Sequence, residues 1–130
     1  VNCRILPGEQ PDLAETLARV IADAKIRVRA DRDVGAAGEP TPVTGPVPEA
    51  ARAVAAAMSP GTPVLPLMST GATDSRHLRA AGIPSYGLKP FPANDDDARR
   101  AHGADERMLE SSFRWGCEFL YRAVEELARK

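Results

Sequence analysis

Three observations predict an α/β fold for this chain. Apolar segments of strand length alternate along the sequence with segments of helical periodicity. Loops of small residues join them, and the loops 68–74 and 89–106 each directly follow a predicted strand. The length, 130 residues, allows one ordinary domain or two small ones. We therefore expect helices on a sheet, with functional loops at the carboxyl ends of strands.

The first part of the chain predicts a β-α-β unit. Residues 1–6 and 25–30 alternate apolar and polar side chains, as half-buried strands do. Between them, one helical stripe holds four apolar residues: Leu13, Leu17, Val20 and Ile21. Both strands are amphipathic, so we expect an α+β sheet with one face in water.

A segment rich in glycine and proline, residues 31–48, separates two structural units. Such a composition is typical of a stiff, irregular connector. We place the connector at 34–47, between a first domain at 1–33 and a second at 48–130.

The second part predicts alternating helices and strands. A helix rich in alanine spans about 48–58, and a short apolar strand follows at 63–67. Asp74 is placed to cap the next helix, which stops at Gly82. Residues 83–88 then form the next predicted strand.

The last part predicts an irregular loop and a long helix. No regular element is expected at 89–106, and the acidic run Asp95–Asp97, which lacks calcium-loop spacing, is interpreted as a solvated loop. In the helix, apolar residues recur every three or four positions: Leu109, Phe113, Cys117, Leu120, Val124 and Leu127. We expect this stripe to be buried, and Cys3 and Cys117 to be buried free thiols.

The composition disfavours two classes of partner. The formal net charge is −1, which gives no electrostatic case for nucleic acid or an anionic membrane. No apolar run approaches the ~20 residues that a membrane-spanning helix needs. We therefore expect neither a nucleic-acid partner nor a membrane span.

One candidate binding loop runs from Ser69 to His77 and gathers hydroxyl groups around Gly71. Glycine lets a backbone approach a ligand closely, and Arg76 could grip a carboxylate in a bidentate manner. The simpler interpretation is that Thr73 or Asp74 caps the following helix while Arg76 forms a surface ion pair.

A second candidate is His102, in the run H-G-A-D-E-R at 102–107. A lone histidine in a loop is usually just solvated. It is also a possible metal ligand, oriented by a nearby carboxylate, but a zinc site needs three or four ligands. The other histidine, His77, lies far away in the sequence.

Four segments in order carry a resemblance: VNCRILPG at 1–8, STGATDSR at 69–76, AGIPSYG at 81–87 and HGADER at 102–107. Together they resemble the zinc metallopeptidases that include carboxypeptidase G, aminoacylase and acetylornithine deacetylase. The run T-D-S-R-H at 73–77 is similar to that of the carboxypeptidase S-like branch.

This resemblance implies a particular arrangement of domains. Residues 48–130 would be the C-terminal part of a zinc-exopeptidase catalytic domain, with helices on a sheet. Residues 1–33 would be the β-α-β half of an α+β lid, or dimerisation domain. The lid strands at 1–6 and 25–30 would then expose unpaired edges, so we expect a homodimer or self-association through the lid sheet.

The resemblance also implies site residues. His102 matches the family's last zinc ligand, in its motif H-G-x-[ND]-E. Arg4 lies where some members place an arginine for the substrate's carboxylate. The loop that lines the substrate pocket is matched by four residues: Gly71, Thr73, Asp74 and Arg76.

Members of the family hydrolyse the amide bond of small peptides or N-acyl amino acids, using two zinc ions and a glutamate general base. The remaining zinc ligands and the base would lie upstream of Val1, where a chain without an initiator Met is expected to continue. We therefore expect no catalytic residue here, weak or absent zinc binding, and a fragment inactive in isolation. The alternatives are a non-catalytic binding or assembly module of the same fold, or an unrelated small α/β domain without metal.

Overall fold

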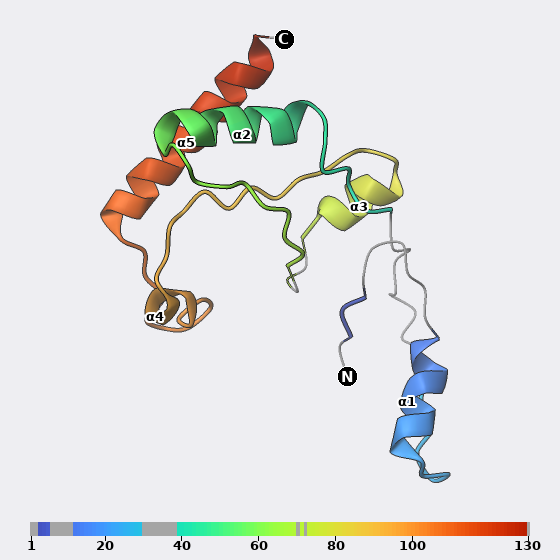
Figure 1. Cartoon of the computed structure of the whole chain (residues 1–130). Coiled ribbons are helices and arrows are strands. Elements are labelled where there is room, and N and C mark those ends of the chain that lie inside the picture. Colours follow the sequence, from blue (N-terminus) through green and yellow to red (C-terminus); the bar gives the residue numbers. More distant parts are fainter. Residues whose placement is uncertain (1–2, 6–11, 30–38, 70, 72, 130) are drawn as a thin grey trace. The chain divides into compact units, whose positions relative to one another are not determined.

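The computed structural model describes residues 3–5, 12–29, 39–69, 71 and 73–129. It holds α1 (Leu13–Ile21), α2 (Pro46–Met58), α3 (Ser75–Ala80), α4 (Asp95–Ala98) and α5 (Glu110–Ala128) (Figure 1). The chain divides into two compact units, which are described separately. Unit 1 comprises Val1–Thr41 and Ser69–Ser85, and unit 2 comprises Pro42–Met68 and Tyr86–Lys130.

The predicted α/β fold is wrong for the part of the chain that the structure describes, which contains helices and no strand. Residues 3–5, 25–29, 63–67 and 83–88 were expected in strands, and none of them pairs with a neighbouring strand. Alternating side chains give an extended segment two distinct faces. They do not supply the adjacent backbone that a strand needs for its hydrogen bonds. Neither the helices-on-a-sheet layer nor the β-α-β half is present in these ranges.

The predicted connector cannot be compared with the structure along its whole length. Residues 34–38 lie outside the described ranges, as do residues 1–2, 6 and 30 of the predicted strands. The division into domains at 1–33, 34–47 and 48–130 therefore stays a prediction. Within the described ranges, none of the helices is long and apolar enough to cross a membrane.

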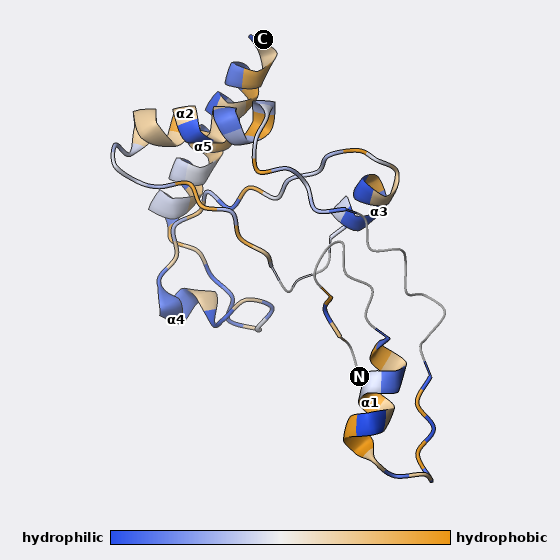
Figure 2. Cartoon of the chain, turned by 45° about the vertical axis from the view of Figure 1, so that its right-hand side comes forward, coloured by the Kyte–Doolittle hydropathy of each residue, from blue (hydrophilic) through white to orange (hydrophobic). Residues whose placement is uncertain are grey.

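The predicted helix after the first segment is confirmed as α1. Asp12 caps it, because its side chain accepts a hydrogen bond from the Glu15 N–H at 2.9 Å. The helix ends at Ala22, whose left-handed backbone (φ 50°) stops the helical repeat. Hydrophobic and hydrophilic residues interleave along α1, as the colours of Figure 2 show. None of its residues is buried.

The alanine-rich helix is confirmed as α2, and its sequence explains its start. Gly45, with φ 111°, precedes Pro46 at the first helical position. Proline suits that position because its fixed φ is helical and its missing N–H would have no partner there. One face of the helix is buried, at Ala50, Ala51, Val54 and Ala55.

The core of unit 2 lies where α2 crosses α5 (Figure 1). The buried face of α2 meets Phe119 and Ala123 of α5. Phe119 also stacks on Trp115, with ring centroids 5.5 Å apart. Small alanine side chains let the two helices approach closely, so that the aromatic rings fill the remaining space.

Gly116 allows a second close approach, between α5 and the chain that precedes α4. A Cβ atom added at Gly116 would lie 2.1 Å from Cδ1 of Phe91, which is shorter than any real contact. Glycine is a poor helix former, by about 1 kcal/mol relative to alanine. Its presence in the middle of α5 is therefore explained by the ring that packs against it.

The final helix is confirmed as α5, but the prediction of its buried stripe is wrong. Its buried residues are Ser112, Gly116, Phe119 and Ala123. Three members of the predicted stripe are more than half exposed: Leu109, Phe113 and Val124. The expected burial of the cysteines is also wrong, since Cys3 and Cys117 are both free and exposed. Two small residues of the buried face, Gly116 and Ala123, permit the close approaches of Phe91 and α2.

Gly116→Ala should destabilise the protein, although it improves helix propensity. Propensity gains about 1 kcal/mol, whereas overpacking a filled site costs about 1–3 kcal/mol, and the 2.1 Å approach to Phe91 places this site among the costly ones. Denaturant unfolding should therefore show a net loss of up to about 2 kcal/mol.

Gly87→Ala is the matched control, because a Cβ atom there meets no atom within 4 Å. In a Phe91→Leu background, Gly116→Ala should lose most of its penalty. A variant more stable than the natural protein in the presence of Phe91 would contradict the close approach.

Candidate functional site

His102 lies at the tip of a turn in unit 2 and has an unusual backbone. Its φ is 66°, in the left-handed region that residues with a side chain seldom adopt. Such a conformation costs of order 1 kcal/mol or more and persists only where its surroundings enforce it. The His102 N–H donates a hydrogen bond to Oε2 of Glu106 at 3.0 Å, which holds the turn on one side.

Gly103 tightens the same turn. Its N–H donates to the Arg100 carbonyl at 2.8 Å. A Cβ atom at Gly103 would lie 2.9 Å from that carbonyl oxygen and 3.1 Å from Oδ1 of Asp105. Glycine is thus required at 103 by the backbone, whereas the left-handed backbone at 102 does not require histidine.

The acidic run that precedes this turn is a short helix, α4, and not the irregular solvated loop that we expected. Asn94 caps it, since its Oδ1 accepts from the Asp97 N–H at 2.8 Å. The Asn94 side-chain amide also donates to Oδ2 of Asp97 at 2.8 Å. This reciprocal capping turns the Asp97 side chain inward, where only 7% of it is exposed.

Five charged residues join α4 to both sides of the turn: Asp96, Asp97, Arg100, Asp105 and Arg107. We call them the Arg–Asp clasp. Arg107 donates from Nε to Asp97 at 2.7 Å and from Nη2 to Asp96 at 3.2 Å. Arg100 lies 3.3 Å from the same Asp96 carboxylate and also pairs with Asp105. The Asp96 carboxylate therefore pairs with Arg100, which precedes His102 in the chain, and with Arg107, which follows it.

The electrostatics of the clasp centre on Asp97. The hydrogen bond from Arg107, aided by the attraction of its positive charge, holds the pKa of the Asp97 carboxyl below its ordinary value of 3.8. Burial opposes this effect but does not cancel it. The same hydrogen bond raises the pKa of Arg107. Asp97 is therefore held as a carboxylate.

The other candidate loop, around Gly71, belongs to unit 1. The Gly71 N–H donates to the Ser69 hydroxyl at 3.1 Å. Asp74 immediately precedes α3, but its side chain makes no capping hydrogen bond. Gly71, Thr73 and Asp74 are all exposed. The cap that the simpler interpretation assigned to Thr73 or Asp74 is not formed.

Arg76 lies in the first turn of α3 and contacts the next residue. Its Nε donates to Nε2 of His77 at 3.1 Å, so that this imidazole nitrogen acts as an acceptor. No carboxylate that the structure describes forms an ion pair with Arg76. The surface ion pair of the simpler interpretation is thus absent from the described ranges, and the guanidinium Nη groups are available to an anion.

Arg4 also belongs to unit 1 and is exposed. No hydrogen bond or ion pair connects it with Gly71, Asp74 or Arg76 in the described part of the chain. The predicted pocket residues thus share a unit, and His102 lies in the other one.

Of the ligands that a zinc site needs, the described residues offer one. No three His, Cys, Asp or Glu side chains converge in these ranges as a metal site would require. The carboxylates nearest in sequence to His102 are already engaged, Glu106 by the His102 N–H and Asp105 by Arg100. The imidazole of His102 is exposed, and imidazole is a side chain that zinc binds.

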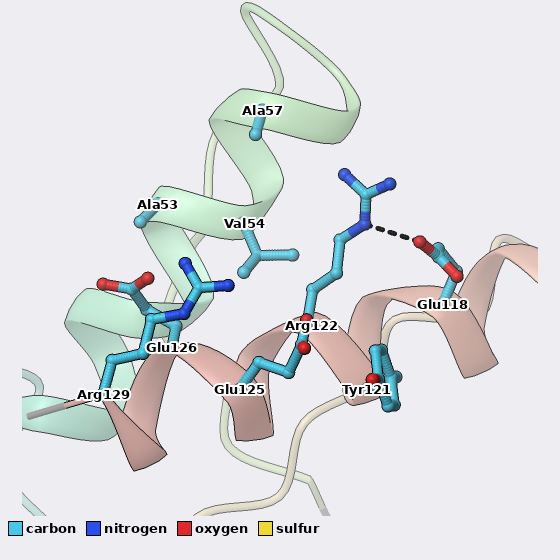
Figure 3. Close-up of a pocket in the computed structure, with 9 residues that line it drawn as sticks. All are labelled: Ala53, Val54, Ala57, Glu118, Tyr121, Arg122, Glu125, Glu126 and Arg129. Atoms are coloured by element: carbon cyan, nitrogen blue, oxygen red, sulfur yellow. Dashed lines mark hydrogen bonds and ion pairs between the residues drawn. The ribbon is translucent and has the colours of Figure 1, made fainter.

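Unit 2 contains a groove and a smaller cavity. A groove of 400 Å³ between α2 and α5 has an alanine-rich wall and a charged rim that includes the Glu118–Arg122 pair (Figure 3). It contains none of the predicted site residues. The second cavity, of 200 Å³, is lined by Asp97 and Arg107 of the clasp and by Ala101 and Glu106, on either side of His102.

The sequence interpretation missed the clasp residues. One signal was available, because Asn94 is followed three positions later by Asp97, in the manner of a capping box. The pairing of Arg100 and Arg107 with particular aspartates had no such signal, since it depends on how the turn folds back on α4.

Comparison with known proteins identifies the family of this chain. The model of peptidase family M20/M25/M40 matches residues 6–126, so the chain belongs to that family. This confirms the resemblance drawn from the sequence motifs, although Arg4 lies outside the matched residues.

Among curated proteins, the chain is similar to probable carboxypeptidase S-like 2 of Dictyostelium discoideum, with 23% identity over 129 residues. The alignment covers 96% of this chain and 24% of that relative. The chain thus spans about a quarter of the length of the relative it matches. No solved structure matches the chain.

The lowered pKa of Asp97 makes the stability of unit 2 depend on pH. Above the ordinary carboxyl pKa of 3.8, the ionised Asp97 contributes its full stabilisation. As pH falls below that value, the unfolded chain takes up the proton first, so the stabilisation is lost through the lower folded pKa. Unfolding measured between pH 7 and 2.5 should show this loss in the natural protein and much less of it in Asp97→Asn.

Asp95→Asn is the matched control, because Asp95 lies in the same helix and forms no ion pair with the residues described. Its pH profile should follow that of the natural protein. Identical profiles for Asp97→Asn and the natural protein would contradict the role of the Arg107 contact.

Proposed function

We propose that this chain is the C-terminal part of a zinc-dependent amidohydrolase or exopeptidase that cleaves the amide bond of small peptides or N-acyl amino acids. The observation that carries the proposal is the His102 turn, in which the family's H-G-x-[ND]-E motif coincides with a backbone fixed in the left-handed region. Membership of the peptidase family and the similarity to a probable carboxypeptidase support it.

In this proposal His102 supplies one zinc ligand. The family is generally zinc-dependent. When bound, zinc polarises the scissile carbonyl and activates water. The carboxylate of Glu106 accepts the His102 N–H, so it orients the main chain on which the imidazole is carried. The general base and the remaining ligands would come from residues outside this chain.

The loop around Gly71 is proposed to line the substrate pocket. Gly71 has no side chain to keep the substrate away, and Thr73 and Asp74 offer polar groups that are exposed. Arg76 retains its Nη groups for the carboxylate of a peptide or an N-acyl amino acid, a planar anion that a guanidinium binds in a bidentate manner. Arg4 is proposed as a second arginine for the same carboxylate.

A non-catalytic binding or assembly module would use the same loop without metal, and zinc content separates that alternative from the enzyme. Homodimerisation stays a prediction. No strand in the described ranges provides the exposed sheet edge on which that prediction was based.

His102→Asn should remove a zinc ligand from the full-length protein. Asparagine tolerates the left-handed backbone, so the turn is retained while the imidazole is lost. We expect one zinc equivalent fewer by metal analysis, and at least a ~100-fold loss of activity, since even indirect partners of a ligand are worth about 10–100-fold. His77→Asn is the control and should keep its zinc. Unchanged zinc stoichiometry in His102→Asn would rule out the ligand role.

Arg76→Ala should weaken substrate binding and leave zinc content intact. A hydrogen-bonded charge pair contributes about 1.5–3 kcal/mol, which corresponds to a rise in KM of about 10- to 100-fold. Steady-state kinetics with an N-acyl amino acid and its amide would test this, because only the free carboxylate should depend on Arg76. Arg114→Ala, at an exposed pair on α5, serves as the control. A KM that does not change would contradict the pocket role.

A further inference from the structure

The Arg–Asp clasp surrounds the turn that carries His102 and has no role in the chemistry proposed above. Its arginines stand on opposite sides of that turn, Arg100 before it and Arg107 after it. Both reach the Asp96 carboxylate, at 3.3 Å and 3.2 Å. The two ion pairs therefore join both ends of the segment from Arg100 to Arg107 to the same carboxylate. His102 lies within this segment of the chain.

The clasp has one firm anchor. Exposed ion pairs contribute little, because water screens them and long side chains lose entropy when they are held. Asp97 differs, since its side chain is only 7% exposed and is also held by the Asn94 amide. Arg107 is thereby fixed to α4 by a charge-assisted hydrogen bond of 2.7 Å, which is shorter than most neutral hydrogen bonds.

The turn needs such an anchor. His102 adopts a left-handed backbone that is strained for a residue with a side chain, and that strain must be balanced by neighbouring contacts. The bonds inside the turn are short-range: His102 N–H to Glu106, and Gly103 N–H to Arg100. The clasp connects the far end of the turn, at Arg107, to α4, which backbone hydrogen bonds already join to Arg100.

We infer that the Arg–Asp clasp is a positioning device that holds the backbone of residues 100–107 in the one conformation that presents His102 to a metal ion. This inference rests on the ligand role proposed for His102. Arg107 and Asp97 are positioning residues in it, since they act on the backbone that carries the imidazole. They act through the backbone, because no side-chain hydrogen bond connects them to the imidazole in the described part of the chain.

The test compares Arg107→Met with Arg107→Lys in the full-length protein. Methionine keeps the apolar stem and removes both ion pairs, whereas lysine keeps the charge and one contact. Arg114→Met is the matched control, because it removes an arginine from the exposed pair with Glu110. Two readouts are measured: hydrogen exchange of the amides at 101–106, and the zinc dissociation constant by competition with a chelator.

Arg107→Met should exchange the His102 amide about 10-fold faster and bind zinc about 10- to 100-fold more weakly, as indirect partners of metal ligands usually do. Arg107→Lys should fall between this variant and the natural protein, and Arg114→Met should change neither readout. Asp97→Asn, which has the same shape as the natural side chain, provides a milder variant if Arg107→Met fails to fold.

Unchanged zinc affinity in Arg107→Met and Asp97→Asn would overturn the inference. His102→Asn separates the two possible failures. If that variant loses zinc while the clasp variants keep it, the ligand role holds and the clasp has no positioning role. If His102→Asn also keeps its zinc, the proposed ligand is wrong and the inference falls with it.

Discussion

The contact between Phe91 and Gly116 limits how the rest of unit 2 can be arranged. Because a Cβ atom at Gly116 would lie 2.1 Å from the ring, only glycine at 116 leaves room for Phe91 as the segment before α4 packs on α5. Phe119 and Ala123, on the same buried face of α5, meet α2. The approach of Phe91 and the crossing with α2 thus share one face of α5, which forms the core of unit 2.

This arrangement gives α4 and the His102 turn a fixed starting point. Phe91 lies three residues before Asn94, which caps α4, and α4 in turn presents Asp96 and Asp97 to the two arginines. Apolar packing and electrostatics therefore have separate effects on this part of unit 2. The apolar contact places the helix, and the buried carboxylate of Asp97 then orients the turn more firmly than exposed ion pairs could.

The helices α1, α2, α3 and α5 were predicted from the sequence because helical signals are local, whereas α4 was expected to be an irregular loop. In the structure, Asp12 before α1 and Pro46 at the start of α2 act within one turn, although the prediction did not use them. The strands were predicted wrongly, because a strand requires a partner distant in sequence. The alternation at 25–30 or 83–88 carries no information about that partner. The stripe of α5 failed for a related reason. Residues on two adjacent faces of α5 recur with helical spacing. The prediction chose the face with the bulkier apolar side chains, which is not the buried one.

For the candidate site, the sequence by itself determined the family, and it predicted the histidine of the H-G-x-[ND]-E motif and the glycine-containing loop at 71–76 as site residues. Those features depend on the order of residues along the chain. Only the tertiary structure decided that His102 is left-handed, that Arg107 pairs with a buried Asp97, and that Arg76 forms no ion pair with any carboxylate described. These are outcomes of packing and charge between segments brought together by folding, and a linear pattern does not encode the distances on which they depend.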